Sequence, residues 1–183
     1  MKVALFGGAF DPPHVGHVVA ATFVRSALGF DEVWWVPSFA HPFGKAMTPF
    51  PHRVAMCRLA AADLGPWAKV SEVESTLSGK SFTVDVLEAL IVAHPDVQFA
   101  WTIGSDVVPD LPKWKQWDRI KALATLVVLN RAGHPDPSAV GPALVPVSST
   151  EVRERLASKR SCEGWVPKAA LGYVKAHGLY GAK

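Results

Sequence analysis

The chain alternates between short apolar runs and longer segments in which apolar residues recur at helical spacing. Mostly apolar runs without regular alternation, typical of strands buried on both faces of a parallel sheet, occur at 3–6, 32–37, 97–103 and 124–130. The spacing predicts helices over 18–28 and 52–64, and a third from 84 to the His94–Pro95 pair. Weaker strand patterns occur at 69–74 and 145–147, and long loops are expected at 38–51 and 133–142. This order predicts an α/β protein, with an open parallel sheet and helices on both faces, in a single domain over 1–183.

The sequence GGAFDPPHVGH, residues 7–17, lies between the first predicted strand and the first predicted helix. Glycines at the end of a strand let the backbone approach a ligand closely, and the free N–H groups of the following helix favour an anion. His14 and His17 are three residues apart, so they share one face at a helix start. The combination predicts a phosphate site. The alternatives for the histidines are a capping or packing pair and a zinc site, although no Cys or acidic third ligand lies nearby in the sequence.

A second helix start combines three hydroxyls with an arginine. Ser148, Ser149, Thr150 and Glu151 form the S-x-x-E pattern of a capping box, and Arg153 follows within the first turns. Capping explains Ser148 and Glu151, but it does not explain the successive hydroxyls or the arginine. We therefore expect this helix start to lie across a crevice from the turn at residue 8, with one polyphosphate held between them.

Three further positions are candidates for ligand contact. Asp106 follows the predicted strand 97–103, at the strand end where open α/β sheets bind ligands. Its carboxylate would accept from a ribose hydroxyl or a metal-bound water, or else cap the next turn. Lys45 lies in the loop 38–51, which is either a binding loop or a surface connection. Trp114 and Trp117 are one helical turn apart, so they either pack in the core or present Trp114 to a planar heterocycle.

Composition excludes several classes of protein. With 49% apolar and 19% charged residues, the chain is globular rather than disordered. The net charge of +3 includes no Lys/Arg run of the kind that binds nucleic acid. Cys57 and Cys162 are isolated, and neither a signal-peptide pattern nor an apolar stretch of membrane-spanning length occurs. We expect a cytoplasmic protein with an anionic small substrate and without a membrane or nucleic-acid partner; the sequence does not indicate its oligomeric state.

Four motifs, in order, resemble one family. Residues 7–17 resemble the GxFDPxHxGH signature of the nucleotidyltransferase superfamily, whose His-x-Gly-His element also occurs in class I tRNA synthetases. A synthetase is excluded because 183 residues leave no room for an anticodon-binding domain. Residues 147–153 resemble the ISSTxIR motif of small-metabolite nucleotidyltransferases. Within that superfamily, residues 81–85 resemble the SYTxDT motif and 104–114 the G-x-D…W element of bacterial nicotinate-nucleotide adenylyltransferases. The resemblance covers essentially the whole chain and implies a Rossmann-like sheet of the nucleotidyltransferase type.

The resemblance implies adenylyl transfer from ATP to nicotinate mononucleotide, giving deamido-NAD and pyrophosphate in NAD biosynthesis. It implies four groups in the chemistry: His14, His17, Lys45 and Arg153. It assigns ATP binding to residues of the two helix starts and of the strand end, namely Gly8, Ala9, Phe10, Gly104, Asp106, Ser148, Ser149 and Thr150. Thr83 and Trp114 are implied at the acceptor nucleotide. Mg²⁺ is expected to arrive with ATP, since the sequence offers no dedicated protein cage.

Some positions depart from the family pattern. Ala9 occupies a position where the family usually has Thr or Ser, Phe82 replaces Tyr, and Leu77 replaces a frequent Arg. The usual Pro-Pro-His-Lys loop is His-Pro-Phe-Gly-Lys at 41–45. The acceptor could therefore also be nicotinamide mononucleotide or phosphopantetheine. Two other classes remain as alternatives: a nucleotide-binding module without turnover, and a nucleic-acid binder.

Overall fold

The protein is built on one parallel sheet, seen in a computed structural model that describes residues 1–40, 44, 46–78 and 81–182. The sheet has six strands in the order β3-β2-β1-β4-β5-β6, and every pairing is parallel. The strands are β1 (Lys2–Gly8), β2 (Glu32–Pro37), β3 (Ala68–Val70), β4 (Gln98–Gly104), β5 (Thr125–Arg131) and β6 (Val140–Leu144). The predicted open α/β fold with a parallel sheet is confirmed.

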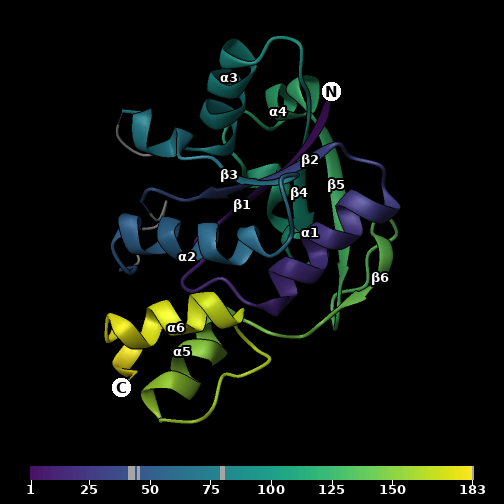
Figure 1. Ribbon diagram of the computed structural model, residues 1–183. Coiled ribbons are helices and arrows are strands. Elements are labelled where there is room, and N and C mark those ends of the chain that lie inside the picture. Colours follow the sequence, from purple (N-terminus) through teal and green to yellow (C-terminus); the bar gives the residue numbers. More distant parts are fainter. Residues whose placement is uncertain (41–43, 45, 79–80, 183) are drawn as a thin grey trace.

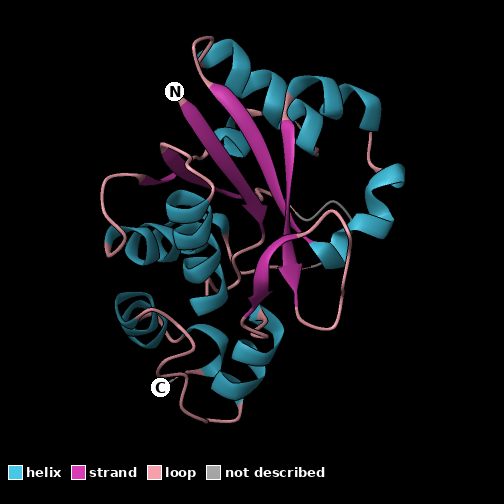
Figure 2. Cartoon of the chain, turned by 90° about the vertical axis from the view of Figure 1, so that its right-hand side faces the viewer, coloured by secondary structure: helices cyan, strands magenta, loops and turns pink. Residues whose placement is uncertain are grey.

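Helices cover both faces of this sheet (Figures 1 and 2). The helices α1 (Val15–Ala27) and α2 (Phe50–Ala62) bury one core cluster with Phe6, Trp35 and Leu129. The helices α3 (Thr83–Ala93) and α4 (Trp117–Leu123) bury a second cluster with Leu5 and Trp101 on the opposite face. Because successive side chains of a strand point to opposite faces, Leu5 and Phe6 divide between the two clusters.

Two further helices lie beyond the carboxyl ends of the strands, at the bottom of Figure 1. These are α5 (Ser149–Ala157) and α6 (Lys168–Ala176), and they share a third core cluster with Met56 of α2. Short 3₁₀ helices occupy Val73–Thr76, Ser105–Lys113 and Leu179–Gly181. Among the residues that the structure describes, no helix combines the length and the apolar character needed to span a membrane.

The first helix shows how the local sequence sets an element's limits. His14 is its N-cap residue, and Gly29 follows the C-cap Leu28 with φ +71°. That left-handed conformation suits glycine after a helix, because no Cβ clashes with the preceding carbonyl. The expected stop of the helix near residue 28 is confirmed, while its start lies three residues earlier than the apolar spacing predicts.

Two strand predictions need correction. The last strand is Val140–Leu144 rather than 145–147, so it occupies part of the predicted loop 133–142. It is a mostly exposed edge strand containing Gly141 and Pro142, and edge strands tolerate proline because one side of the backbone has no partner strand. The predicted strand 69–74 is also shorter: pairing ends at Val70, and Val73 begins a 3₁₀ helix. In both segments the apolar residues continue beyond the paired strand, at Val73 in the first and at Val145 and Val147 in the second.

Candidate functional site

The turn after β1 presents two stacked imidazoles. The rings of His14 and His17 lie 3.7 Å apart at their centroids. His17 Nδ1 accepts a hydrogen bond of 3.1 Å from the backbone N–H of His14. Because Nδ1 accepts, the proton of neutral His17 lies on Nε2. His17 therefore does cap the start of the helix, as one alternative expects, but it uses only Nδ1 for this, and its Nε2–H remains available as a donor.

The second helix start lies directly against this turn. Ser149 Oγ donates to the carbonyl of Pro12 at 2.8 Å, and Arg153 Nη1 donates to the carbonyl of Asp11 at 2.6 Å. Ser148 forms the expected capping box with Glu151. Two helix beginnings, separated by 137 positions at the Ser149–Pro12 contact, are therefore brought together, but in direct contact rather than across an open crevice.

A cavity of about 540 Å³ opens at the carboxyl ends of the strands beside this junction. On one face of the sheet it is lined by Phe6, Ala20 and Leu129 from the α1–α2 side. On the other face it is lined by Trp101 and Ile120 from the α3–α4 side. The cavity thus has lining residues from both faces of the sheet, around the end of β1.

The structure brings seven of the expected site residues to the cavity wall. They come from four separate segments: Gly8, His14, His17, Thr83, Gly104, Asp106 and Trp114. Gly7 also lines it, and a Cβ at that position would overlap the Trp101 ring, so the backbone passes there without a side chain.

Other expected residues lie near the cavity without lining it. These are Ala9, Phe10, Ser148, Ser149, Thr150 and Arg153. Phe10 is only 2% exposed and its ring stacks on Trp35, so its side chain belongs to the core. The guanidinium of Arg153 is held by the Asp11 carbonyl and by Thr150 Oγ1. Lys45 lies outside the described residues.

Trp114 packs in the core, as one interpretation of the tryptophan pair expects, and its contact with a heterocycle stays a prediction. Its ring lies 6.3 Å from that of Trp117 in an edge-to-face arrangement, and it packs on the core beneath α3 and α4. It also lines the cavity. The two residues are not on one helix, because Trp114 follows the 3₁₀ helix Ser105–Lys113 and Trp117 begins α4.

Both histidines are held in the neutral form. Burial lowers the pKa of His14 to about 4, and the positive charge of Arg131 adds to this while Glu151 opposes it. Burial also lowers the pKa of His17 well below its usual value, with further contributions from His14 and Arg131. At neutral pH each imidazole is thus one donor and one acceptor rather than a cation.

These shifts predict a loss of stability in mild acid. The pKa of His14 falls from 6.5 to about 4 on folding, so between these values the unfolded chain binds a proton that the folded chain does not. The free energy of unfolding has its full value above pH 6.5 and falls as the pH decreases. For each such group, the equilibrium constant of unfolding rises roughly tenfold per pH unit. Urea unfolding at pH 7, 6 and 5 measures this. His14→Asn should flatten the profile, whereas the exposed His134→Asn should leave it unchanged; equal profiles for all three proteins would contradict the prediction.

Three charged residues that sequence patterns did not indicate support or line the site. Arg53 is 1% exposed and donates to the carbonyls of Ala9 and Thr48, each at 2.8 Å. Glu74 accepts from Ser81 Oγ at 2.6 Å and from the Phe39 N–H at 2.9 Å. Burial raises the pKa of Glu74, the largest of several effects on it.

Arg131, the third of these residues, lines the cavity at the end of β5. Its position after an apolar strand was a usable signal, because ligands lie beyond such ends. Arg53 and Glu74 gave no signal, because their contacts with Ala9 and Phe39 join residues 44 and 35 positions apart.

Comparison with known proteins agrees with this architecture. The family model described as Cytidylyltransferase-like matches residues 5–155. A protein of Myxococcus xanthus (strain DK1622), "Probable nicotinate-nucleotide adenylyltransferase", is 50% identical over 100% of this chain and 96% of its own length. A protein of the same description from Bacillus pumilus (strain SAFR-032) is 37% identical over 98% of each chain.

A solved structure shares the fold at lower identity. It is the Plasmodium falciparum nicotinic acid mononucleotide adenylyltransferase complexed with NaAD, with a TM-score of 0.85 and 20% identity, covering 100% of this chain and 98% of that one. With half of its residues identical to those of the Myxococcus xanthus protein along its whole length, the chain belongs to the family of nicotinate-nucleotide adenylyltransferases.

Proposed function

We propose that the chain transfers the adenylyl group of ATP to the phosphate of nicotinate mononucleotide, releasing deamido-NAD and pyrophosphate. The observation that carries this is a single cavity that reaches both faces of the sheet, with the neutral pair His14 and His17 on its wall. Family membership supports the same reaction, since the relatives named above are described as nicotinate-nucleotide adenylyltransferases.

The reaction is an in-line displacement at the α-phosphorus of ATP. The acceptor phosphate attacks, the bond to the β-phosphate oxygen breaks, and no covalent enzyme intermediate is needed, so positioning and charge stabilisation carry the catalysis. His17 would donate from Nε2 to a phosphate oxygen as negative charge develops, because its Nδ1 is already held by the His14 N–H. His14 would donate to the neighbouring phosphate.

ATP is assigned to the α1 side of the cavity, where the backbone at Gly8 approaches without a side chain. Asp106 would accept from a ribose hydroxyl. The Ser149 and Arg153 contacts hold the second helix start against the 11–12 backbone. For Arg153 to neutralise pyrophosphate, it would exchange the Asp11 carbonyl for phosphate. Lys45 stays a proposed pyrophosphate contact from the loop.

We assign Mg²⁺ to the substrate rather than to a protein site. Among the described residues, no group of three or more His, Cys, Asp or Glu side chains is placed to hold a metal ion. Asp106 Oδ1 is buried and has no hydrogen-bond partner there, so it fits a water carried by the ion. The magnesium would screen the ATP phosphates as they enter.

The acceptor side of the cavity is positively charged. Lys113 and Lys115 line it beside Trp114, and Lys115 Nζ lies 5.0 Å from the centre of the Phe82 ring. The backbone N–H of Trp114 already donates to the Leu111 carbonyl, so it is not available to the nicotinate carboxylate. Lys113 is paired with Asp110 and Lys115 with Asp85. We propose that the lysines exchange these carboxylates for that of nicotinate, which gives the preference over the neutral nicotinamide.

Pyrophosphate formation from ATP with each acceptor tests the assignment. We expect nicotinate mononucleotide to react at least about tenfold faster, in kcat/KM, than nicotinamide mononucleotide, equivalent to ~1.4 kcal/mol. Faster reaction with nicotinamide mononucleotide or phosphopantetheine would overturn the acceptor. Binding of ATP without pyrophosphate release would indicate a non-catalytic module. We further propose that the protein has no nucleic-acid partner, which an oligonucleotide titration tests.

A further inference from the structure

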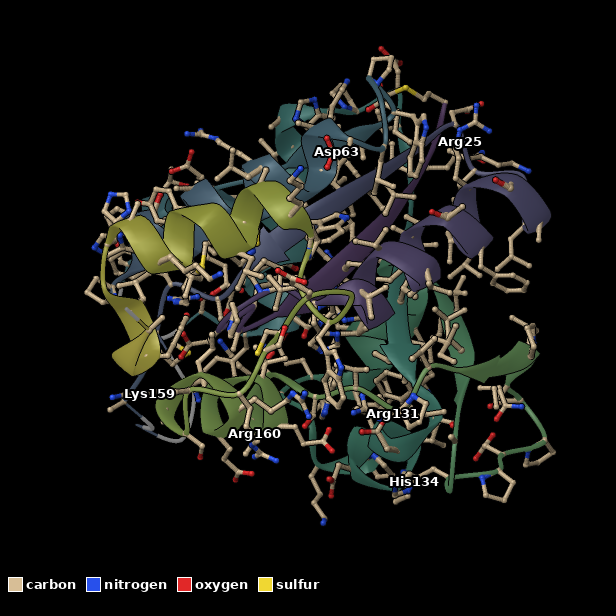
Figure 3. All side chains as sticks on the ribbon, turned by 60° about the horizontal axis from the view of Figure 1, so that its bottom comes forward. Arg25, Asp63, Arg131, His134, Lys159 and Arg160 are labelled. Atoms are coloured by element: carbon tan, nitrogen blue, oxygen red, sulfur yellow. The ribbon has the colours of Figure 1, made fainter. Side chains whose placement is uncertain are left out.

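Arg131 is the last residue of β5, and the fold fixes its backbone firmly. Its N–H donates to Ser105 Oγ at 2.9 Å, and its carbonyl accepts from the His134 N–H at 2.9 Å. Ser105 Oγ also donates to the His134 carbonyl, which ties the end of β5 to the start of the 3₁₀ helix after β4. Figure 3, which views the molecule from the side of α5 and α6, shows Arg131 and His134 close together at this end.

The side chain of Arg131 is much less constrained than its backbone. It is 43% exposed and lines the cavity, with its Cδ 3.6 Å from where a Cβ would stand on Gly104. Its Nε lies 3.6 Å from Asp106 Oδ2, longer than the roughly 2.7–2.9 Å of a charge-assisted hydrogen bond. Asp106 Oδ1 has no hydrogen-bond partner among the described residues. The ion pair is therefore loose, and neither charge is fully satisfied.

The positive charge of Arg131 contributes to lowering the pKa of both His14 and His17, and all three residues line the same cavity. Three other cations near the cavity are engaged: Arg153 by the Asp11 carbonyl, Lys115 by Asp85, and Lys113 by Asp110. Among the residues that the structure describes, Arg131 is therefore the guanidinium on the cavity wall that has no close hydrogen-bond partner for its side chain.

We propose that Arg131 is a phosphate-binding residue of the reaction, exchanging its loose contact with Asp106 for a bidentate contact with the ATP phosphates. This rests on the proposed function in that the ligand is a nucleotide polyphosphate. The exchange frees both oxygens of Asp106 to accept from the substrate. A planar guanidinium suits this role because it presents two parallel N–H donors to phosphate oxygens.

Equilibrium binding of three probes separates this role from a structural one. For Arg131→Gln we expect at least about tenfold weaker binding of ATP and of inorganic pyrophosphate, with adenosine affinity unchanged. Arg131→Lys should recover part of the loss for both anions. Arg119→Gln is the matched control, because Arg119 pairs with Glu88 on the surface, away from the cavity. Unchanged ATP and pyrophosphate binding in Arg131→Gln, or equal losses for adenosine, would overturn the proposal.

The same variants keep this proposal distinct from the proposed function. If the wild-type protein releases no pyrophosphate with any acceptor, the proposed function is wrong. The affinities of wild type and Arg131→Gln for ATP and pyrophosphate still decide whether Arg131 binds phosphate. If the wild type turns over and Arg131→Gln binds and reacts as well as Arg119→Gln, the reaction stands and the role of Arg131 is wrong. Thermal unfolding of both Arg131 variants confirms that they are folded, and the lysine variant supplies the test if the glutamine variant is not.

Discussion

His17→Ala is expected to lower kcat by about a hundredfold or more, with a much smaller change in the affinity for ATP. The donor at Nε2 is aimed by the bond that Nδ1 accepts from the His14 N–H, so it is in place before the substrate arrives. Losing one such donor to developing charge costs about 3–4 kcal/mol in comparable sites. Because the charge develops in the transition state, the loss appears in kcat rather than in ground-state binding. Steady-state pyrophosphate release together with equilibrium ATP binding measures both quantities.

A second substitution separates catalysis from folding. Asn at position 17 can still accept the His14 N–H through its amide oxygen, but its side chain ends short of the position of Nε2. We therefore expect His17→Asn to unfold at nearly the wild-type temperature and yet to lose most of the activity. The exposed His134→Ala serves as the control. A His17→Ala protein with wild-type kcat would remove His17 from the mechanism.

Arg53→Met is expected to destabilise the protein by about 3 kcal/mol or more, which corresponds to a fall of about 6–12 °C in Tm for a chain of this size. Methionine has a similar length but no donor, so the carbonyls of Ala9, Thr48 and Phe39 lose their partner inside the protein. Hydrogen bonds to a charged group contribute more than neutral ones, and buried carbonyls left without a donor add a desolvation cost. Urea or thermal unfolding measures the difference.

The neighbouring Arg58 provides the control on the same helix. Its side chain is 63% exposed and pairs with Glu72 at the surface, so Arg58→Met should cost less than about 1 kcal/mol. Arg53→Lys should lie between wild type and Arg53→Met, because an ammonium cannot reach all three carbonyls at once. Similar unfolding midpoints for Arg53→Met and Arg58→Met would show that the buried guanidinium does not hold the turn after β1.

The central strands and the first helix could be predicted because their physics is local. The run at 32–37 is buried on both sides and coincides with β2, and the capping pattern at 148–151 marks the beginning of α5. The edge strand Val140–Leu144 could not be predicted in this way. Its residues are mostly exposed, so its pairing with β5 depends on backbone hydrogen bonds that leave no apolar pattern in the sequence.

The site residues also divide into those that a local pattern indicates and those that depend on tertiary contacts. His14 and His17 could be identified because a short spacing places them together on a helix start. Arg53 reaches the Ala9 carbonyl across 44 positions, and nothing in the sequence near either residue indicates the contact. Arg153 was placed at the correct junction, but its guanidinium contacts a backbone carbonyl instead of the open cavity. Contacts made by the tertiary structure decide which of several plausible cations is free for a ligand.

The cavity bends around the end of β1, where Gly7 passes beneath Trp101 without a side chain. In the proposed assignment, the adenosine and the pyridine ring of the product would lie on opposite faces of the sheet, joined across the glycine turn. We therefore expect a dinucleotide analogue with a flexible linkage to bind more tightly than a rigid, straight one of equal length.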